Sequence, residues 1–484
     1  MQSQLPSTDF GKMRRVPLPV SFLKVPCMST IVEQLTAYAS QLTYDALPPP
    51  VVQQAKRLIV DSIGCALGGY TSEPAQIARA MASTVNSTKP ATVIGSGQRT
   101  SMDMGTFANG VMLRFLDFND GYTSTGESGH PSDSIAAILT VSDALGTNGR
   151  DVIVATVLAY EVFCRICDEV DLKPIGFDHV TVGGMASTAA SAYLFGLRNE
   201  KFAQAMNLGI APNVALYQTR IGHVSMWKGC AYANASRNAV FAAMLASRGM
   251  TGPSPIFEGV GGYFKAVTRK SFALAQLGGA SHPYKILECS IKHFPLGQYS
   301  QTVVEAALEL RAKIGNVDDI EEISIETVTA AVRLMAGDPE KWTPANRETA
   351  DHSMPYTVAI ALLYGGVESK HFDEEYLRDP KVLGLAAKVK VAISEEADRH
   401  MPHAMRCHFA VKTKQGAKHE AMVDYHRGHY RNPMTDAEVE GKFRPLAAAV
   451  LDGAQTDRLL SLLWKLDEQP NVNELMKATV GGKK

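Results

Sequence analysis

The stretch LDFNDGYTSTGESGHPSD, residues 116–133, is a glycine-containing polar break between two apolar segments. The segment before it, FANGVMLRFL, and the segment after it, SIAAILTVSDAL, both carry apolar residues at three-to-four spacing, which predicts a helix on each side. Asp117 then lies near the end of the first helix and His130 just ahead of the second. We therefore expect two titratable side chains to converge on one rim of a helical assembly.

The same helical spacing recurs from residue 29 to about residue 282, and Gly or Pro punctuates the segments. Many contact positions are Ala, Gly or Ser, which allows helices to approach closely. No strand–helix alternation supports a dinucleotide-binding core. The predicted helices are IVEQLTAYASQL, VVQQAKRLIVDSIGCAL, AQIARAMAST, DVIVATVLAYEVFCRICDEV, MASTAASAYLFGL, EKFAQAMNLGIA and ASRNAVFAAMLASRG.

The pattern changes after Pro283, where short β-prone runs alternate with helical segments, so residues 283–434 are predicted to form a smaller α+β domain. From Thr435 the chain is helical again and begins with a Thr-Asp-Ala-Glu capping box. Residues 1–28 are basic and proline-containing, which predicts a disordered extension rather than a targeting peptide, with Met28 as an alternative start. The predicted strands are EEISIETV, KVKVAISEE and CHFAVKTKQG, and the helices between them are QTVVEAALELRAK and MPYTVAIALLYGG.

Composition narrows the possible partners. The 484 residues include 48 Lys and Arg against 49 Asp and Glu, so no net field favours nucleic acid or a membrane surface, and an anionic ligand needs local positive charge. No apolar run reaches the roughly 18 to 20 residues of a transmembrane helix. The seven cysteines are scattered, which is typical of a reducing compartment, and Cys164 and Cys167 are expected to be buried structural thiols.

The string LDFND followed by GHPSD resembles the signature of the MmgE/PrpD family, which includes 2-methylcitrate dehydratases, cis-aconitate decarboxylases and an iminodisuccinate epimerase. The resemblance runs in the family's order over nearly the whole chain after about residue 29. It implies a mainly α protein in which a large all-helical domain is built from both chain ends, 29–282 and 435–484, with the α+β domain inserted as a lid. It also implies a homodimer. The further matching stretches are Phe177-Asp178-His179, MWKGCAYANASRNA, IKHFPLGQYSQ, RETADHSMPY and GHYRNPMTDAEVEGKFR.

The family's chemistry alters a proton or a carboxylate at a carbon flanked by carboxylates. Such substrates, small di- or tricarboxylates, require cations to hold them and a group that moves a proton. The residues of this chain that match the active-site pocket of the family's decarboxylases are Asp117, His130, His179, Lys228 and Lys292.

The two residues of the polar break are the expected proton carriers. His130 lies between Gly and Pro, which fix its backbone, and imidazole titrates nearest neutrality, so it is assigned general acid/base work and a part in substrate binding. The alternative is a helix-capping or core histidine. Asp117 is either the second proton carrier or the group that orients a lysine or histidine. Which of the two residues is the acid and which the base stays open, and the alternative for Asp117 is a surface acid at a helix end.

The remaining three residues are expected to bind the substrate or assist catalysis. Lys228 lies among Trp, Met, Gly, Cys and Ala, so we expect a buried ammonium that binds a substrate carboxylate, rather than a surface lysine with a buried stem. Lys292 precedes a helix starting near Ser300, and both are expected to present positive potential to an anion. Lys292 is thus predicted to act in binding and in catalysis, and His179 in catalysis.

Other motifs predict neither a metal nor a cofactor. His400, His403, Cys407 and His408 are crowded in RHMPHAMRCH, but their spacing matches no standard tetrahedral zinc site. The glycine turns at 95–97 and 259–262 lack the strand and helix of a phosphate cradle. No GxSxG elbow and no cluster-binding cysteine set occurs. We expect cofactor-free chemistry.

The resemblance implies a metal-independent hydro-lyase that dehydrates 2-methylcitrate or a related tricarboxylate to a 2-methyl-cis-aconitate type product, in the cytoplasm or, in a eukaryote, the mitochondrial matrix. One alternative is decarboxylation of cis-aconitate to itaconate, or epimerisation of a substituted succinate. Two features disfavour decarboxylation: a histidine of the animal itaconate-forming enzymes is Gly297 or Gln298 here, and the DFND-to-GHPSD spacing is closer to bacterial methylcitrate dehydratases. A catalytically inactive binding protein is disfavoured because burying unpaired charged side chains costs free energy, and a protein without catalytic function would gain nothing from that cost.

Overall fold

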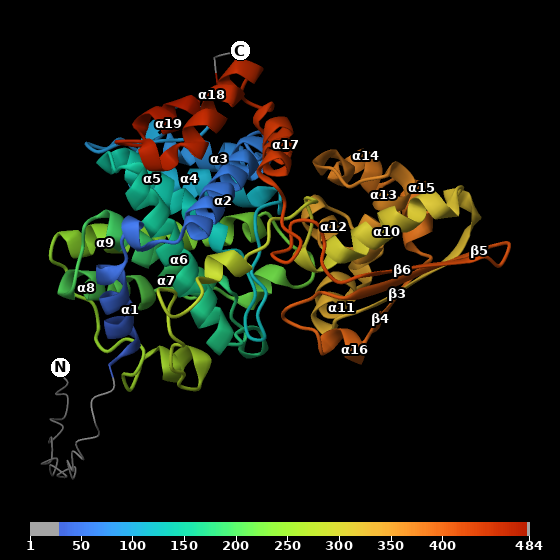
Figure 1. The fold of residues 1–484 in the computed structure, drawn as a ribbon, viewed down its shortest axis with the longest axis horizontal. Coiled ribbons are helices and arrows are strands. Elements are labelled where there is room, and N and C mark those ends of the chain that lie inside the picture. Colours follow the sequence, from blue (N-terminus) through green and yellow to red (C-terminus); the bar gives the residue numbers. More distant parts are fainter. Residues whose placement is uncertain (1–28, 482–484) are drawn as a thin grey trace, which may run out of the picture.

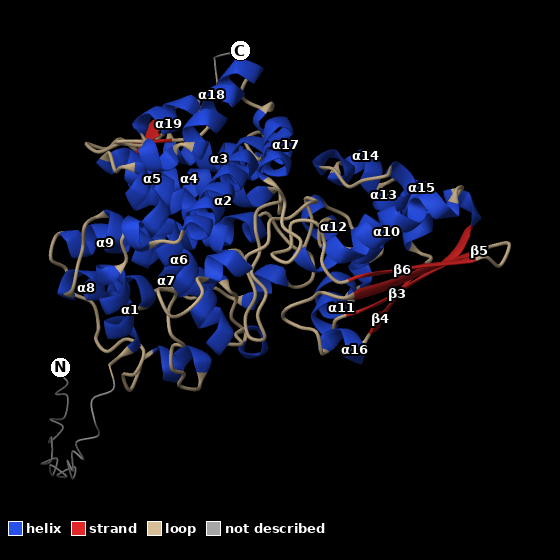
Figure 2. Ribbon diagram, in the orientation of Figure 1, coloured by secondary structure: helices blue, strands red, loops and turns tan. Residues whose placement is uncertain are grey.

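The computed structural model describes residues 29–481 and is mostly helical with a small sheet, as predicted (Figures 1 and 2). The predicted N-terminal extension, residues 1–28, lies outside the described residues. Within the described chain, no helix has both the length and the apolar character needed to cross a membrane. Two hydrophobic cores organise the chain, and we call the parts built around them the larger and the smaller lobe.

The larger lobe is helical and contains the first core, which takes residues from Ile31 to Ile291 and again from Met434 to Met476. Figure 1 shows the C-terminal helices beside helices from the first third of the chain. The helices of this lobe are α1 (Ile31–Gln41), α2 (Pro49–Gly68), α3 (Glu73–Ala82), α4 (Met102–Phe115), α5 (Ile135–Leu145), α6 (Gly149–Glu169), α7 (Val180–Leu194), α8 (Glu200–Ile210), α9 (Trp227–Ser247), α17 (Asp436–Ala447), α18 (Gly453–Trp464) and α19 (Asn473–Ala478). The short strands β1 (Ala91–Thr92) and β2 (Arg99–Thr100) pair antiparallel.

Small residues bring the central helices of this lobe together. Helices α4 and α7 both pack on α9. A Cβ added to Gly110 of α4 would stand 2.8 Å from the Cβ of Ala233 on α9, so no larger residue fits there. Helix α7 begins at Val180, five residues earlier than predicted, and Gly183 in the extra turn lies against the ring of Tyr232. Tertiary packing therefore overrides the low helix propensity of the Gly183-Gly184 pair.

Helix α17 packs the C-terminal part of the chain against the N-terminal helix α2. Its N-cap Thr435 forms the predicted capping box: the Thr435 hydroxyl accepts from the Glu438 N–H and the Glu438 carboxylate accepts from the Thr435 N–H. The helix packs on α2, where a Cβ on Gly64 would stand 2.9 Å from Cδ2 of Phe443. The C-terminal residues are thus part of the first core.

The smaller lobe contains the second core, which takes residues from Phe294 to Ala421. Its sheet has the order β4-β3-β5-β6, with β3 parallel to β4 and antiparallel to β5. The strands are β3 (Ile320–Thr327), β4 (Val389–Ile393), β5 (Cys407–Thr413) and β6 (Lys418–Val423), and the helices are α10 (Gln301–Ile314), α11 (Thr329–Ala336), α12 (Arg347–Ala350), α13 (Met354–Tyr364), α14 (Glu374–Leu377), α15 (Pro380–Ala386) and α16 (Glu395–Asp398).

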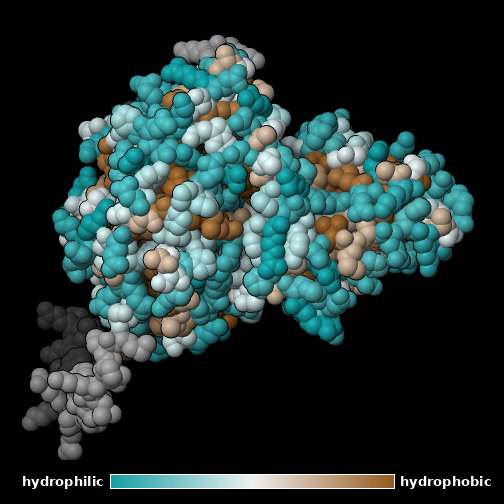
Figure 3. Space-filling view, in the orientation of Figure 1, coloured by the Kyte–Doolittle hydropathy of each residue, from teal (hydrophilic) through white to brown (hydrophobic). Residues whose placement is uncertain are grey.

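The polarity of the surface and the state of the cysteines agree with the expectations from the amino-acid composition. Figure 3 shows a face that is mostly hydrophilic, with small scattered hydrophobic patches. The six cysteines within residues 29–481 are all buried with free thiols, which confirms the prediction for Cys164 and Cys167. Cys27 lies outside the described residues.

Candidate active site

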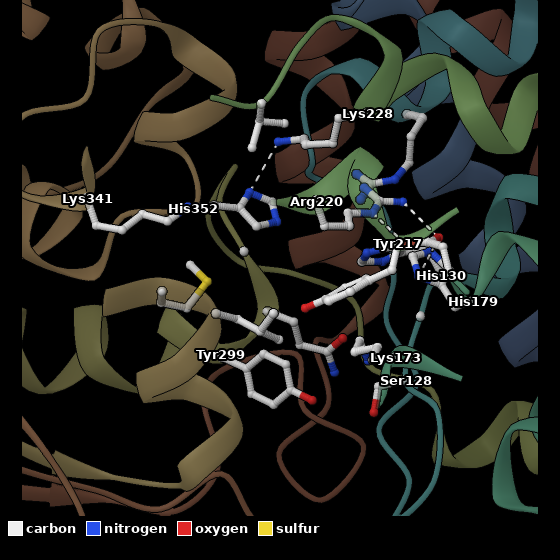
Figure 4. A pocket seen from close by; sticks show the side chains of 18 residues that line it. Ser128, His130, Lys173, His179, Tyr217, Arg220, Lys228, Tyr299, Lys341 and His352 are labelled. Atoms are coloured by element: carbon white, nitrogen blue, oxygen red, sulfur yellow. Dashed lines mark hydrogen bonds and ion pairs between the residues drawn. The ribbon is translucent and has the colours of Figure 1, made fainter. Parts of the chain in front are cut away.

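A pocket with about 720 Å³ of empty space, part of it open to solvent, lies where the two lobes meet. The larger lobe lines it with polar loop and helix residues, and the smaller lobe closes the other side (Figure 4). The larger-lobe residues are Arg114, Ser128, Gly129, His130, Lys173, Asp178, His179, Tyr217, Arg220, Val224 and Lys228; the smaller-lobe residues are Gly297, Gln298, Tyr299, Leu334, Met335, Lys341 and His352.

His130 presents an unprotonated nitrogen to this pocket. Its Nδ1 lies 2.7 Å from the main-chain carbonyl oxygen of Asp120. Because a carbonyl can only accept, Nδ1 carries the proton and Nε2 carries the lone pair in the neutral ring. Burial, and then the positive charges of Arg114 and Lys292, hold the His130 pKa well below its usual range. The imidazole is therefore neutral and able to accept a proton.

His179 is a second neutral imidazole beside the first. The two ring centroids lie 5.5 Å apart, edge to face. Nδ1 of His179 lies 3.2 Å from Asp178 Oδ1, while its buried Nε2 has no hydrogen-bond partner in the described chain. Burial lowers the His179 pKa to about 3. Gly129 allows this arrangement, since a Cβ there would stand 2.5 Å from Cδ2 of His179.

Asp178 fixes both His179 and a cation. Its Oδ2 accepts a hydrogen bond from Nε of Arg220 at 2.9 Å, and its Oδ1 accepts from the N–H of Val180 at 3.0 Å. Burial alone would raise the Asp178 pKa, but Arg220 and His179 hold it below its usual range. The carboxylate thus orients the imidazole and holds the guanidinium on the pocket wall.

Asp117 is the centre of a buried charge cluster. It is 0% exposed, so a surface acid is excluded, and its φ of 50° is a left-handed conformation that residues other than Gly adopt rarely. Oδ1 accepts from Arg114 Nη1 at 2.6 Å and from Lys292 Nζ at 2.5 Å. Oδ2 lies 3.2 Å from His352 Nε2 and 3.7 Å from Lys228 Nζ.

The charges around Asp117 decide its protonation. Burial would raise its pKa, but Arg114 and Lys292, and then His352 and Lys228, hold it well below its usual range. Asp117 is therefore an ionised carboxylate at neutral pH. It is not among the residues that line the pocket. Its contacts suit a group that orients cations better than one that donates a proton.

Lys292 faces Asp117 instead of the pocket. Its ammonium is 1% exposed and also donates to the main-chain carbonyl of Asp117 at 2.9 Å. Burial lowers its pKa to about 8, and the attraction of Asp117 opposes that shift. Helix α10 begins at Gln301, one residue after the predicted start, but Lys292 is not among the lining residues.

Lys228 joins the two lobes and lines the pocket. It is 2% exposed, so the alternative of a surface lysine is wrong. Its Nζ donates to Asp351 Oδ1 at 2.6 Å and lies 3.1 Å from His352 Nδ1. The carboxylate that this buried ammonium contacts is thus an aspartate of the smaller lobe, whereas the sequence led us to expect a substrate carboxylate.

Several site residues escaped the sequence analysis as individual residues. Arg114 is a buried cation within an apolar helix, which is an unusual placement and could have drawn attention to it. His352 lies in the RETADHSMPY match, which was read only as a family feature. Nothing in the sequence near Arg220 or Lys341 indicates that either reaches the pocket.

One group of possible metal ligands lies in the cluster: oxygen or nitrogen atoms of Asp117, Asp351 and His352 lie within 4.8 Å of one another. Lys292 and Lys228 already occupy these carboxylates at 2.5 and 2.6 Å. A divalent cation there would face two ammonium groups at short range, and this repulsion disfavours metal binding.

The sequence model of the MmgE/PrpD N-terminal domain matches residues 33–275, and that of the MmgE/PrpD C-terminal domain matches residues 294–468. The chain is 28% identical over 480 residues to 2-methylcitrate dehydratase of Escherichia coli K12, covering 92% of this chain and 95% of that protein. It is 25% identical over 466 residues to cis-aconitate decarboxylase of Homo sapiens, covering 91% and 92%. A mitochondrial 2-methylcitrate dehydratase of Yarrowia lipolytica is 28% identical over 391 residues, covering 75% and 72%.

Proposed function

This chain belongs to the MmgE/PrpD family, and we propose that it is a hydro-lyase that removes water from 2-methylcitrate or a closely related tricarboxylate. Relatives named 2-methylcitrate dehydratase match it over most of their length and support this assignment. One observation carries it furthest: a single pocket combines five cationic side chains with three neutral imidazoles, those of His130, His179 and His352. The cations are Arg114, Lys173, Arg220, Lys228 and Lys341.

In the proposed reaction, His130 Nε2 removes the proton from the carbon next to a substrate carboxylate. The C–H electron pair forms the carbon–carbon double bond as the C–O bond to the neighbouring hydroxyl breaks. The imidazolium of His130 then returns its proton to the departing hydroxide, so that water leaves and the neutral imidazole is restored. In this proposal His179 Nε2, which can only accept in this tautomer and has no partner in the described chain, accepts a hydrogen bond from the substrate hydroxyl.

The remaining predicted residues have supporting roles in this proposal. Lys228 binds a substrate carboxylate and stabilises the negative charge that develops as the proton leaves. Asp117 stays ionised and fixes Lys292 and Arg114, so both act on the reaction through the position and charge of the cluster. A trianionic substrate would raise the His130 pKa by adding negative charge nearby, which favours proton abstraction once substrate is bound.

Decarboxylation of cis-aconitate is the second candidate, because the human relative bears that name over most of its length. In this chain Gly297 and Gln298 both lie on the pocket wall, at the place where the animal enzymes are expected to carry a histidine. The Gln298 amide donates to the Thr123 hydroxyl at 2.7 Å. A pocket wall without that imidazole supports dehydration over decarboxylation.

The substrate assignment is tested with chelator-treated protein and 2-methylcitrate, citrate and cis-aconitate in separate samples. Alkene absorbance in the ultraviolet and carbon dioxide are followed together. We expect alkene from 2-methylcitrate without carbon dioxide. Carbon dioxide from cis-aconitate would favour the second candidate, and silence on all three substrates would refute both.

We also propose the larger organisation implied by the family. The larger lobe would form a helical domain from both chain ends, and the smaller lobe would act as a lid whose closure excludes water. Exposed apolar side chains of the segment 214–227 would contribute to the interface of a homodimer. Light scattering can measure the mass of the protein in solution and so test for the dimer. The proposed location is the cytoplasm, or the mitochondrial matrix in a eukaryote.

A further inference from the structure

We propose that Lys341 binds the carboxylate that distinguishes a tricarboxylate from a dicarboxylate. This inference rests on the proposed function and names the residue that selects its substrate class. The ligand chemistry is an aliphatic tricarboxylate of citrate size.

Lys341 is a buried cation whose ammonium has no acceptor among the described residues. It ends the short helix η9 (Pro339–Lys341) of the smaller lobe, is 3% exposed and lines the pocket. Figure 4 shows its side chain extending toward His352. Within residues 29–481 its Nζ makes neither a hydrogen bond nor an ion pair. Burial and the nearby charge of Lys228 lower its pKa, which is the expected result of an ammonium without a counter-charge.

Every other cation that lines the pocket has a carboxylate partner in the described chain. Lys173 pairs with Glu127, and Arg220 pairs with Asp178. Lys228 pairs with Asp351, and Arg114 pairs with Asp117. Lys341 is therefore the lining cation whose charge a ligand carboxylate would neutralise without displacing a protein partner.

The backbone holds Lys341 in place although its ammonium is free. The Ser353 hydroxyl donates to the main-chain carbonyl of Lys341 and also accepts from the Tyr356 N–H at 3.1 Å, which caps α13. Ser353 directly follows His352. One capped helix start thus fixes the backbone from which both the His352 ring and the Lys341 side chain extend.

The position of Lys341 in the pocket favours a role in selecting the substrate over a role in the chemical step. Figure 4 shows Lys341 entering the pocket from one side and His130 and His179 from the other. A carboxylate bound at Lys341 is then held away from the carbon that gives its proton to His130. A third carboxylate is the group that would gain from this extra cation, whereas a dicarboxylate can be held by Lys228 and Arg220 alone.

The test is calorimetric binding of two ligands that have no hydroxyl to lose. Tricarballylate, propane-1,2,3-tricarboxylate, is compared with glutarate, which has the same chain without the central carboxylate. The full-length wild type is measured beside Lys341→Met, Lys341→Arg and Lys381→Met. Lys381 is an exposed lysine of the smaller lobe without an ion pair in the structure and serves as the matched control.

We expect Lys341→Met to weaken tricarballylate binding by about tenfold or more, which equals about 1.4 kcal/mol, and glutarate binding by less than about threefold. Lys341→Arg and Lys381→Met should stay within about threefold of the wild type for both ligands. Equal weakening of both ligands, unchanged tricarballylate binding, or no binding to the wild type would overturn the proposal.

Two readouts separate this inference from misfolding and from the proposed reaction. Removing an unpaired buried cation relieves desolvation and repulsion, so Lys341→Met should melt at or above the temperature of the wild type. A lower melting temperature for this variant would contradict the absence of a partner. Protein that binds tricarballylate through Lys341 but leaves 2-methylcitrate unchanged would refute the dehydration and leave the subsite intact.

Discussion

At the residue scale, the site depends on oppositely charged side chains that are buried together. Asp117 contacts Arg114 and Lys292 directly, and Lys228 and His352 lie within 3.7 Å of its second oxygen. A buried carboxylate beside the three cations Arg114, Lys292 and Lys228 stays ionised. Burial, together with the positive charges of Arg114 and Lys292, keeps the nearby His130 unprotonated.

The pH dependence of the reaction is predicted to report Lys292. Its pKa of about 8 lies below the usual value for lysine, so raising the pH through about 8 removes its proton and takes one cation from Asp117. We expect kcat/KM of the wild type to fall as the pH rises above about 8. Lys292→Arg carries a charge that persists through this range, so its alkaline fall should move above about pH 10.

The measurement is the initial rate of alkene formation between about pH 6 and pH 10 for both proteins, because kcat/KM reports groups of the free enzyme. The Lys381→Met variant is the control for a general effect of lost surface charge. A wild-type profile that stays flat to pH 10, or the same alkaline fall in Lys292→Arg, would contradict the role given to Lys292.

The sequence could predict which residues form the candidate active site, but only some of the contacts between them. The chain-order motifs named Asp117, His130, His179, Lys228 and Lys292, and the structure places all five in or against one pocket. Lys292 faces an aspartate because a buried lysine takes the nearest carboxylate, and no local pattern encodes a contact across 175 residues. The place of Lys341 in the pocket could not be predicted for the same reason, because it depends on packing between distant parts of the chain.

At the element scale, helix α17 reaches the site through one lysine. Nζ of Lys442 donates to the main-chain carbonyls of Phe118 at 2.6 Å and Lys292 at 2.9 Å. It also lies 2.5 Å from Asp61 Oδ1 on α2. The C-terminal helix thus fixes the two backbone segments that carry Asp117 and Lys292.

We predict that Lys442→Met lowers kcat by about tenfold to a hundredfold, because loosening these segments misplaces the charge cluster. It should also lower the free energy of unfolding by about 3 kcal/mol, since Asp61 is left buried without its partner. The double variant Asp61→Asn with Lys442→Met should recover most of the stability but not kcat. Recovery of both would show that Lys442 only stabilises the fold.

Helices and strands with a clear local sequence pattern were predicted from the sequence. A strand that forms only by pairing with an adjacent strand was not. The capping box at Thr435 and strand β3 can each be recognised from a short pattern of polar and apolar residues. Strand β6 was not predicted because its sequence, KHEAMV, begins with three polar residues and contains no β-prone run; it is extended by pairing with β5 around the turn at Gly416. Pairing energy and not propensity forms that strand.

At the scale of the whole molecule, the pocket exists because two separate cores meet. The first core continues to Ile291, whereas the helical pattern of the sequence ended near 282, since the segment from Tyr284 to Ile291 packs on the helices without being a regular helix. Lys228 of the larger lobe and Asp351 of the smaller lobe form an ion pair across the junction. The site is therefore complete only when both lobes are in contact.

The measurement that tests the central claim most directly compares alkene formation from 2-methylcitrate by the wild type and by His130→Asn, with tricarballylate binding as the check that the pocket is intact. We predict that the wild type forms the alkene, that His130→Asn is slower by about a hundredfold or more, and that both bind tricarballylate within about threefold of each other. Similar rates for the two proteins, or no alkene from the wild type, would contradict a pocket in which His130 carries the proton of a tricarboxylate dehydration.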